Sequence, residues 1–192
     1  FLKSGPGFDG SCFKKDILNL VYLSRFYGLN EVADYWENVV IINSWQQNRI
    51  SKLIIKNLFG TLSGKKLAIF GFSFKANTND TRESPSINIS KDLLKEDAKL
   101  SIYDPKVLKN KILSEFEHNE NKDNILICNS PLEACRGADA VIVLTDWDEF
   151  RTLEWDKIFT IMRKPAWVFD SRICLNKSFL MQIGFKVWTL GA

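Results

Sequence analysis

The sequence is poor in the residues that most often build metal sites. It has one histidine, His118, and four cysteines, none of them spaced as C-x-x-C. Structural zinc sites use cysteine and histidine ligands at short regular spacings, so we expect no zinc site and no other metal. Cys128, Cys135 and Cys174 are better explained as small buried residues with free thiols, which suits a protein of the reducing cytoplasm.

Other absences exclude whole classes of partner. No run of about twenty apolar residues is present, and the start of the chain has no apolar signal-peptide region, so we expect no membrane interaction. The net charge of +3 at pH 7 is too small to indicate nucleic-acid binding. The 192-residue chain begins at Phe1 rather than at methionine, so we expect it to be part of a longer protein or a processed product.

Glycine and proline are absent from residues 31–59. Asn30 is a good capping residue, and apolar side chains recur at helical spacing after it, which predicts a helix approaching roughly 40 Å in length. A shorter helix is expected before it, between Cys12 and Gly28. A long helix with apolar side chains on more than one side needs a partner. We favour a homodimer interface over burial between two parts of one chain.

After residues 60–64, short apolar runs alternate with helical patterns. Strands are predicted at 66–70, 99–103, 125–128, 140–144, 166–169 and 185–189, and helices at 86–95, 107–116, 131–135, 154–162 and 177–183. This alternation predicts an α/β fold with a Rossmann-like, doubly wound parallel sheet. We therefore expect a helical domain over residues 1–60 and a sheet domain over residues 65–192.

A glycine-rich turn at residues 5–10 leads through Ser11 to Cys12 and then into a helical pattern. The N-terminus of a helix and the nearby lysines favour thiolate over thiol, and the glycines permit close approach of a ligand. The spacing also matches the G-x-G-x-x-G dinucleotide fingerprint. We reject that match because the region near Asn30, where the fingerprint needs a strand, is helical. Cys12 is thus predicted to be a nucleophile.

The loop after the first predicted strand, residues 71–85, lies where a doubly wound sheet binds its ligand. It lacks the second and third glycines of the fingerprint, so we expect a nucleotide there but not the pyrophosphate of NAD. Lys75 and Arg82 are interpreted as contacts to a phosphate or a sugar. For Asp80 and Ser84, capping of the next helix is an equally good explanation.

Two residues after later strands have competing explanations. Asp104 could contact a ribose, but we favour a role in the turn that it forms with Pro105. Arg172 follows an apolar strand and is placed like a ligand-binding residue. It could equally be an ordinary surface arginine.

The two loops together resemble the UDP-glucose 6-dehydrogenase family, within the wider UDP-glucose/GDP-mannose dehydrogenase group. The family's cysteine motif, Gly-Phe-Gly-Gly-Ser-Cys-Phe-x-Lys-Asp, is matched by residues 7–16, and its motif Phe-Lys-x-x-Thr-x-Asp-x-Arg-Glu-Ser by residues 74–84. The resemblance extends along the whole chain. Asp9 replaces a family glycine, and Asn77 stands at a commonly acidic position.

The resemblance implies that the chain comprises the central and UDP-binding parts of a homodimeric enzyme that oxidises UDP-glucose to UDP-glucuronate with two NAD. It implies a thiohemiacetal and then a thioester on Cys12, with Asp16 positioning or activating water. Implied contacts to the UDP-sugar are Lys3, Gly7, Phe8, Phe74, Lys75 and Arg172, and implied contacts to the cofactor are Lys15 and Arg82. NAD would be bound mostly by an absent N-terminal domain, so the chain alone is expected to be inactive.

Alternatives remain. The parent enzyme could act on UDP-N-acetylmannosamine or GDP-mannose, although the Ser-Cys-Phe-x-Lys-Asp sequence at residues 11–16 favours UDP-glucose. The chain could also be a non-catalytic module that binds sugar nucleotides. Two departures from the family pattern keep that alternative open: Asp9, which brings a negative charge close to an anionic substrate, and Asn77.

Overall fold

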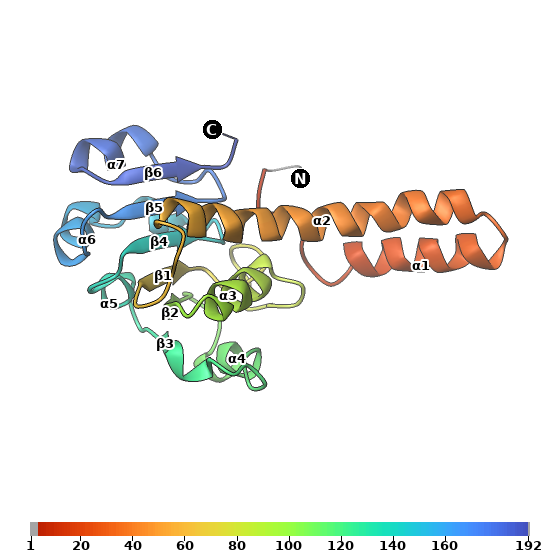
Figure 1. The fold of residues 1–192 in the computed structure, drawn as a ribbon, viewed down its shortest axis with the longest axis horizontal. Helices are drawn as coiled ribbons and strands as arrows, with labels where there is room; N and C mark the ends of the chain where they lie inside the picture. Colours follow the sequence, from red (N-terminus) through yellow and green to blue (C-terminus); the bar gives the residue numbers. More distant parts are fainter. Residues whose placement is uncertain (1–3, 192) are drawn as a thin grey trace.

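A helical hairpin projects from an α/β body in the computed structural model, which describes residues 4–191 (Figure 1). The hairpin consists of α1 (Phe13–Phe26) and α2 (Asn30–Asn57). Gly28, with φ of 73°, forms the left-handed turn between them, as its position in the sequence predicts. No described helix is long and apolar enough to cross a membrane.

The start of α2 differs from the expectation. Asn30 is the first residue of the helix rather than its cap, and Leu29 occupies the capping position without a side-chain hydrogen bond. The turn is instead closed by backbone groups, because the amide of Leu29 donates to the carbonyl of Ser24 at 2.9 Å. The prediction that Asn30 caps α2 is therefore wrong.

The α/β body contains one sheet of six parallel strands in the order β3-β2-β1-β4-β5-β6. The strands are β1 (Lys66–Phe70), β2 (Lys99–Tyr103), β3 (Ile125–Ile127), β4 (Ala140–Val143), β5 (Trp167–Asp170) and β6 (Lys186–Thr189). The chain winds outward from β1 in one direction and from β4 in the other. This confirms the predicted doubly wound sheet, and it places the topological switch point, where such sheets bind ligands, between β1 and β4.

Helices connect the strands, and the helix predicted at 107–116 is shorter in the structure. They are α3 (Pro85–Lys95), α4 (Lys109–Ser114), α5 (Pro131–Cys135), α6 (Trp155–Ile161) and α7 (Lys177–Ile183), with 3₁₀ turns at Lys122–Asn124 and Asp148–Arg151. Helix α4 begins two residues later than expected. The carboxylate of Asp104 accepts hydrogen bonds from the amides of Lys106 and Val107, at 2.9 Å each, and holds them in a turn.

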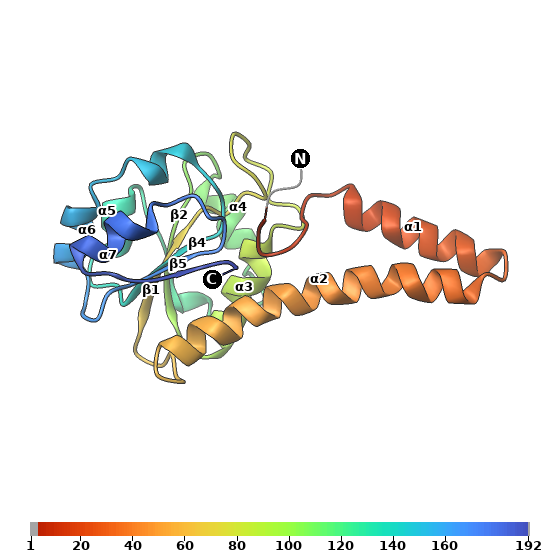
Figure 2. The ribbon, with the colours of Figure 1, turned by 90° about the horizontal axis from the view of Figure 1, so that it is seen from above.

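Apolar side chains cover both faces of the sheet. Along β1, Leu67 and Ile69 join one core and Ala68 and Phe70 the other, as expected for a strand buried on both faces. The first core includes side chains from α3, α4 and the C-terminal half of α2; the second includes side chains from α5, α6 and α7. Figure 2 shows α2 running from the sheet body to the tip of the hairpin. The hairpin is therefore anchored in the core of the sheet.

The strands β1 and β4 approach each other closely where both end. Gly71, directly after β1, has φ of 88°, and a Cβ atom there would lie 2.3 Å from the Cβ of Thr145. The Thr145 hydroxyl donates to the carbonyl of Ser73 at 2.6 Å. Only glycine fits at position 71, because both its conformation and its space exclude a side chain. This contact fixes the loop that follows β1.

Candidate functional site

The residues that precede α1, 5–12, form a segment that we call the Cys loop, and α2 holds it in place. The amide side chain of Asn43 accepts a hydrogen bond from the Phe8 amide at 2.8 Å and donates one to the Phe8 carbonyl at 3.0 Å. Gly7 has φ of 138°, and a Cβ atom there would lie 2.5 Å from Asn43 Oδ1. The sequence gives no sign of this role for Asn43, because the residue lies within an ordinary helical pattern.

Cys12 lies at the N-cap position of α1, as its sequence predicts, and its side chain is exposed. Its Sγ lies 3.9 Å from Ser11 Oγ, and it makes no capping hydrogen bond. The amide of Asp16 donates to the Cys12 carbonyl at 2.9 Å, which places Asp16 one helical turn further on, where it is exposed. The thiol is thus accessible at the positive end of a helix dipole.

The other three cysteines are buried, as predicted: Cys128 is 5%, Cys135 0% and Cys174 7% exposed. Burial raises the pKa of Cys128, and it raises the pKa of Cys174 to about 12. Desolvation also strongly raises the pKa of Cys135. Chemical reactivity of thiols in the folded chain is therefore expected at Cys12 alone among the four.

The loop between β1 and α3, residues 71–84, is named here the Lys75 loop. Asp80 binds the Arg82 guanidinium, with Nη2 and Oδ2 at 2.7 Å, and this hydrogen bonding lowers the pKa of Asp80 to about 2. Ser84 caps α3 by accepting a hydrogen bond from the Ser86 amide. Of the two residues proposed to cap α3, Ser84 does so, whereas the Asp80 carboxylate binds Arg82 instead. The exposed Lys75 ammonium lies 5.2 Å from the centre of the Phe74 ring.

Arg172 joins the Cys loop to the carboxyl ends of the strands. Its Nε donates to the Leu144 carbonyl at 2.7 Å, and its Nη2 donates to Asp9 Oδ2 at 2.8 Å and to the Phe74 carbonyl at 3.2 Å. The side chain is only 12% exposed. The alternative that Arg172 is an ordinary surface arginine is therefore wrong.

Asp9, the residue that departs from the family motif, is also largely buried. Its side chain is 18% exposed, and burial raises the pKa of the carboxyl group while the hydrogen bond from Arg172 acts in the opposite direction. Its negative charge is therefore directed at a guanidinium within the protein.

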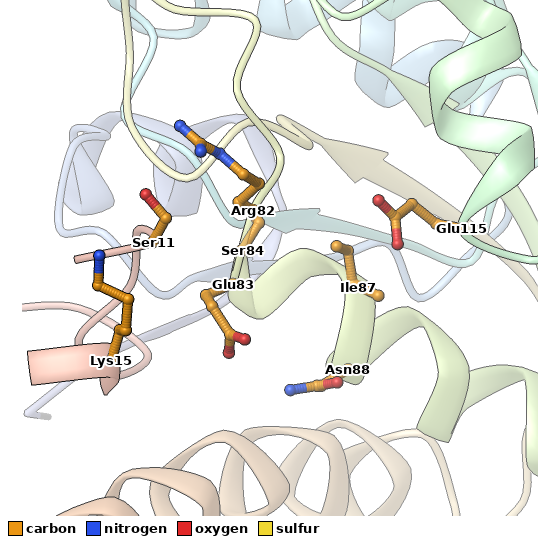
Figure 3. A pocket seen from close by; sticks show the side chains of 8 residues that line it. All are labelled: Ser11, Lys15, Arg82, Glu83, Ser84, Ile87, Asn88 and Glu115. Atoms are coloured by element: carbon orange, nitrogen blue, oxygen red, sulfur yellow. The ribbon is translucent and has the colours of Figure 1, made fainter. Parts of the chain in front are cut away.

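A pocket of about 530 Å³ opens where the start of α1 meets the Lys75 loop. Lys14 and Glu83 form an ion pair of 2.8 Å across this junction. Figure 3 shows the side chains that line the pocket, contributed by the Cys loop, α1, the Lys75 loop, α3 and the end of α4: Ser11, Lys15, Arg82, Glu83, Ser84, Ile87, Asn88 and Glu115. Hydrogen bonding and charge from Asp80 raise the pKa of Arg82. Ser11, which lines the pocket, directly precedes Cys12, so the thiol lies close to this pocket.

The structure thus brings most of the predicted site residues to one junction. Lys15 and Arg82 line one pocket, and Arg172 joins the Cys loop, which includes Gly7, Phe8 and Cys12, to the Lys75 loop, which includes Phe74 and Lys75. Asp16 is exposed one helical turn along α1 and does not line the pocket. A Cβ atom on Gly10 would lie 3.3 Å from the Phe74 ring, so the two groups are in contact. Lys3 lies outside the described residues.

The end of β2, where a dinucleotide fold places an acidic residue on the ribose, is unsuited to that role here. Asp104 is 9% exposed. Its Oδ2 accepts hydrogen bonds from the amides of Phe72 and Ser73, the Ser73 hydroxyl and the Trp147 indole, and its Oδ1 accepts two more in the turn after β2. The preferred structural role of Asp104 is confirmed, and this sheet does not fit NAD in the usual cradle.

Within residues 4–191, no cluster of acidic, histidine or cysteine side chains is arranged to hold a metal.

Curated relatives cover the whole chain. It is 47% identical over 195 residues to the UDP-glucose 6-dehydrogenase of Caenorhabditis elegans and 48% identical over 199 residues to that of Gallus gallus. Each alignment covers 100% of this chain but 40% of the relative, so the chain spans about two fifths of the length of these relatives.

Solved structures share the fold at lower identity. The NDP-N-acetyl-D-galactosaminuronic acid dehydrogenase of Methanosarcina mazei has a TM-score of 0.78 at 22% identity, covering 99% of this chain and 39% of that one. The GDP-mannose dehydrogenase of Pseudomonas aeruginosa has a TM-score of 0.69 at 20% identity, covering 91% and 38%.

Family models account for both parts of the chain. The central domain of the UDP-glucose/GDP-mannose dehydrogenase family matches residues 1–45, which include the Cys loop, α1 and the first half of α2. The UDP-binding domain of the same family matches residues 68–177, which is more than half of the chain. With its doubly wound sheet and its exposed thiol beside the Lys75 loop, the chain belongs to the UDP-glucose/GDP-mannose dehydrogenase family.

Proposed function

We propose that the chain is the sugar-nucleotide-binding and thiol-bearing portion of an enzyme that oxidises UDP-glucose to UDP-glucuronate. The observation that carries this proposal is the contact of Arg172 with both the Cys loop and the Lys75 loop. We propose that this contact holds the exposed Cys12 thiol close to the ligand edge of the sheet. Identity of nearly one half to UDP-glucose 6-dehydrogenases supports UDP-glucose over other sugar nucleotides. In this proposal residues 1–60 are the central domain and residues 65–192 the UDP-binding domain.

The substrate would lie across the carboxyl ends of β1, β4 and β5. Cations at this edge suit a diphosphate, and the proposed contacts are Lys75 and Arg172. Phe74 would offer an aromatic face to the ligand. Phe8, whose ring packs against Phe13 with the ring centres 4.8 Å apart, is the second proposed aromatic contact, and Gly7 would allow the backbone to approach the ligand. Lys3, which the family resemblance also implies as a contact to the substrate, completes the proposed set.

Cys12 and Asp16 carry the covalent chemistry in this proposal. The Cys12 thiolate adds to the aldehyde carbon at the sugar C6 position, forming a thiohemiacetal whose oxidation gives a thioester. Asp16, an exposed carboxylate one turn along α1, takes a proton from the water that attacks the thioester carbonyl. Cleavage of the C–S bond then releases the carboxylate product and restores the thiol.

NAD is the expected oxidant, and it would accept one hydride in each of the two oxidation steps. Because the sheet of this chain does not fit the usual NAD cradle, we propose that other parts of the parent protein hold most of the cofactor. Lys15 and Arg82 line the pocket beside the thiol, and their charges suit an anionic cofactor approaching from outside. The chain by itself would then bind the sugar nucleotide without transferring hydride.

Two further expectations concern the whole protein. We propose a homodimer formed through the helical hairpin, because its two helices expose many large apolar side chains: Leu18, Tyr22, Phe26, Tyr35, Ile41, Ile42 and Trp45. We also retain the cytoplasmic location predicted from the free cysteines.

Titration calorimetry of the chain with UDP, UDP-glucose, GDP and GDP-mannose tests the proposal. We expect UDP and UDP-glucose to bind at least about tenfold more tightly than their guanine counterparts. A preference for GDP would contradict the proposed substrate.

The alternative function is a module that binds sugar nucleotides without catalysis. The buried pair of Asp9 and Arg172 favours it, because Asp9 brings a negative charge close to the proposed substrate. Slow alkylation of Cys12, at the rate of an unactivated thiol, would favour that module.

A further inference from the structure

One ion pair at the proposed site has no role in the mechanism above. Asp9 and Arg172 meet at 2.8 Å, are separated by 163 residues in the sequence, and are 18% and 12% exposed. We infer that Asp9 is an internal competitor that occupies the anion-binding group of Arg172, so that a nucleoside diphosphate must displace the Asp9 carboxylate to bind there. This inference rests on the proposed function, because it assumes that a phosphate group reaches Arg172.

The position of Arg172 makes it a ready anion site. It follows β5, at the same edge as the switch point between β1 and β4, and its backbone amide is fixed by Asp170 at 3.0 Å. Its Nε is committed to the Leu144 carbonyl, which orients the guanidinium plane. A guanidinium held in this way presents its outer nitrogen to an oxyanion, and the only carboxylate that binds it among the described residues is Asp9.

The charged groups that surround Asp9 would also surround a bound diphosphate. The charges of Arg172 and Lys75 stabilise its carboxylate, while the nearby carboxylate of Asp146 opposes it. A phosphate group entering here would meet the same two cations. Asp9 and the ligand would therefore compete for the same two cations. If both were bound there, two negative groups would lie close together in a place that is largely buried from solvent.

The backbone around Asp9 allows the exchange. Gly7 and Gly10 flank the residue with φ of 138° and 83°, and the two hydrogen bonds from Asn43 hold Phe8 rather than Asp9. The carboxylate can thus leave Arg172 while the rest of the Cys loop stays anchored. Arg172 then keeps its bonds to the Leu144 and Phe74 carbonyls.

Calorimetry with UDP on the whole chain tests the inference with Asp9→Asn and Asp9→Gly. Both variants remove the competing charge, so we expect each to bind UDP at least about tenfold more tightly than the unaltered chain, a change of about 1.4 kcal/mol in binding free energy. Glu37→Gln is the matched control. It removes the same charge from an ion pair of 2.6 Å with Arg25 on the hairpin, and it should leave the affinity for UDP unchanged.

A double-mutant cycle separates competition from simple repulsion. In an Arg172→Gln background Asp9 has no guanidinium to occupy, so Asp9→Asn should improve UDP binding much less than it does in the unaltered chain. If the gain is the same in both backgrounds, Asp9 does not act through Arg172 and the inference is wrong. Should Arg172→Gln fail to fold, equal affinity for UDP in Asp9→Asn and in the unaltered chain would still overturn the inference.

The outcomes also separate the inference from the proposed function. Equal and measurable affinity for UDP in the unaltered chain, Asp9→Asn and Asp9→Gly would overturn the competitor role and leave the proposed function standing. Absence of UDP binding in all three would contradict the proposed function, and with it the inference.

Discussion

At the scale of single residues, the Cys loop depends on one amide side chain. Asn43→Ala removes both hydrogen bonds to Phe8 and leaves its backbone groups without partners in a partly buried place. We expect a loss of about 1–3 kcal/mol in the free energy of unfolding. Urea denaturation measures it. Asn48→Ala, an exposed asparagine of the same helix, is the control and should change stability by less than about 0.5 kcal/mol. Equal effects of the two variants would contradict the role of Asn43.

A second prediction at this scale concerns pH. The pKa of Asp80 is about 2 in the folded chain, below its ordinary value of 3.8, because Arg82 donates hydrogen bonds to the carboxylate. A lowered folded pKa stabilises the protein above pH 3.8 and loses that effect as the pH falls towards 2. Asp80→Asn should therefore lower the urea midpoint slightly at pH 6 but not at pH 2. The effect is small because Arg82 is exposed. A difference that persists undiminished at pH 2 would refute this assignment.

The proposed site residues could be named from the sequence because they lie in short continuous motifs. Ser11 and Cys12 follow a glycine-rich segment, and Lys75 and Arg82 belong to one loop. Contacts between distant residues left no local pattern. Asn43 lies 35 residues from Phe8, and Asp9 lies 163 residues from Arg172, so neither pairing could be derived from spacing.

At the scale of elements, the site depends on the close approach of β1 and β4. Gly71→Ala adds a Cβ atom 2.3 Å from the Thr145 side chain and 2.8 Å from its backbone nitrogen, in addition to a strained φ of 88°. We expect it to cost at least about 3 kcal/mol of stability. Gly137→Ala is the matched control, because its φ of 67° is strained but nothing lies within 4 Å. It should cost only about 1–2 kcal/mol. Thermal or urea unfolding compares them, and equal losses would show that the contact with Thr145 is unimportant.

The elements themselves were largely predictable. Buried parallel strands are continuous apolar runs, and they were recognised for that reason. Errors arose where side chains or backbone closed a turn in a way that composition does not reveal. Helix α4 begins later than predicted because Asp104 binds the amides of Lys106 and Val107. Helix α2 lacks the expected cap at Asn30 because a backbone hydrogen bond from Leu29 closes the preceding turn.

At the scale of the whole molecule, the hairpin is the proposed dimer interface. Ile42 is 62% exposed on α2, and Ile42→Lys places a charge in that apolar surface. We expect the variant to sediment as a monomer at concentrations where the unaltered chain is a dimer. Leu108→Lys, which changes an equally exposed apolar residue of the sheet body (66%), should leave the dimer intact. A monomeric unaltered chain at high concentration would contradict the proposal.

The central claim is that the Cys12 thiol lies beside the sugar of a bound UDP-sugar. Alkylation by iodoacetamide in the native state reports on Cys12, because the other three cysteines are buried, and Cys12→Ser gives the background rate. With saturating ligand, UDP-glucose should slow the alkylation of Cys12 strongly, and UDP, which lacks the sugar, should slow it much less. If UDP-glucose binds and the alkylation rate does not change, the thiol lies away from the sugar and the account is contradicted.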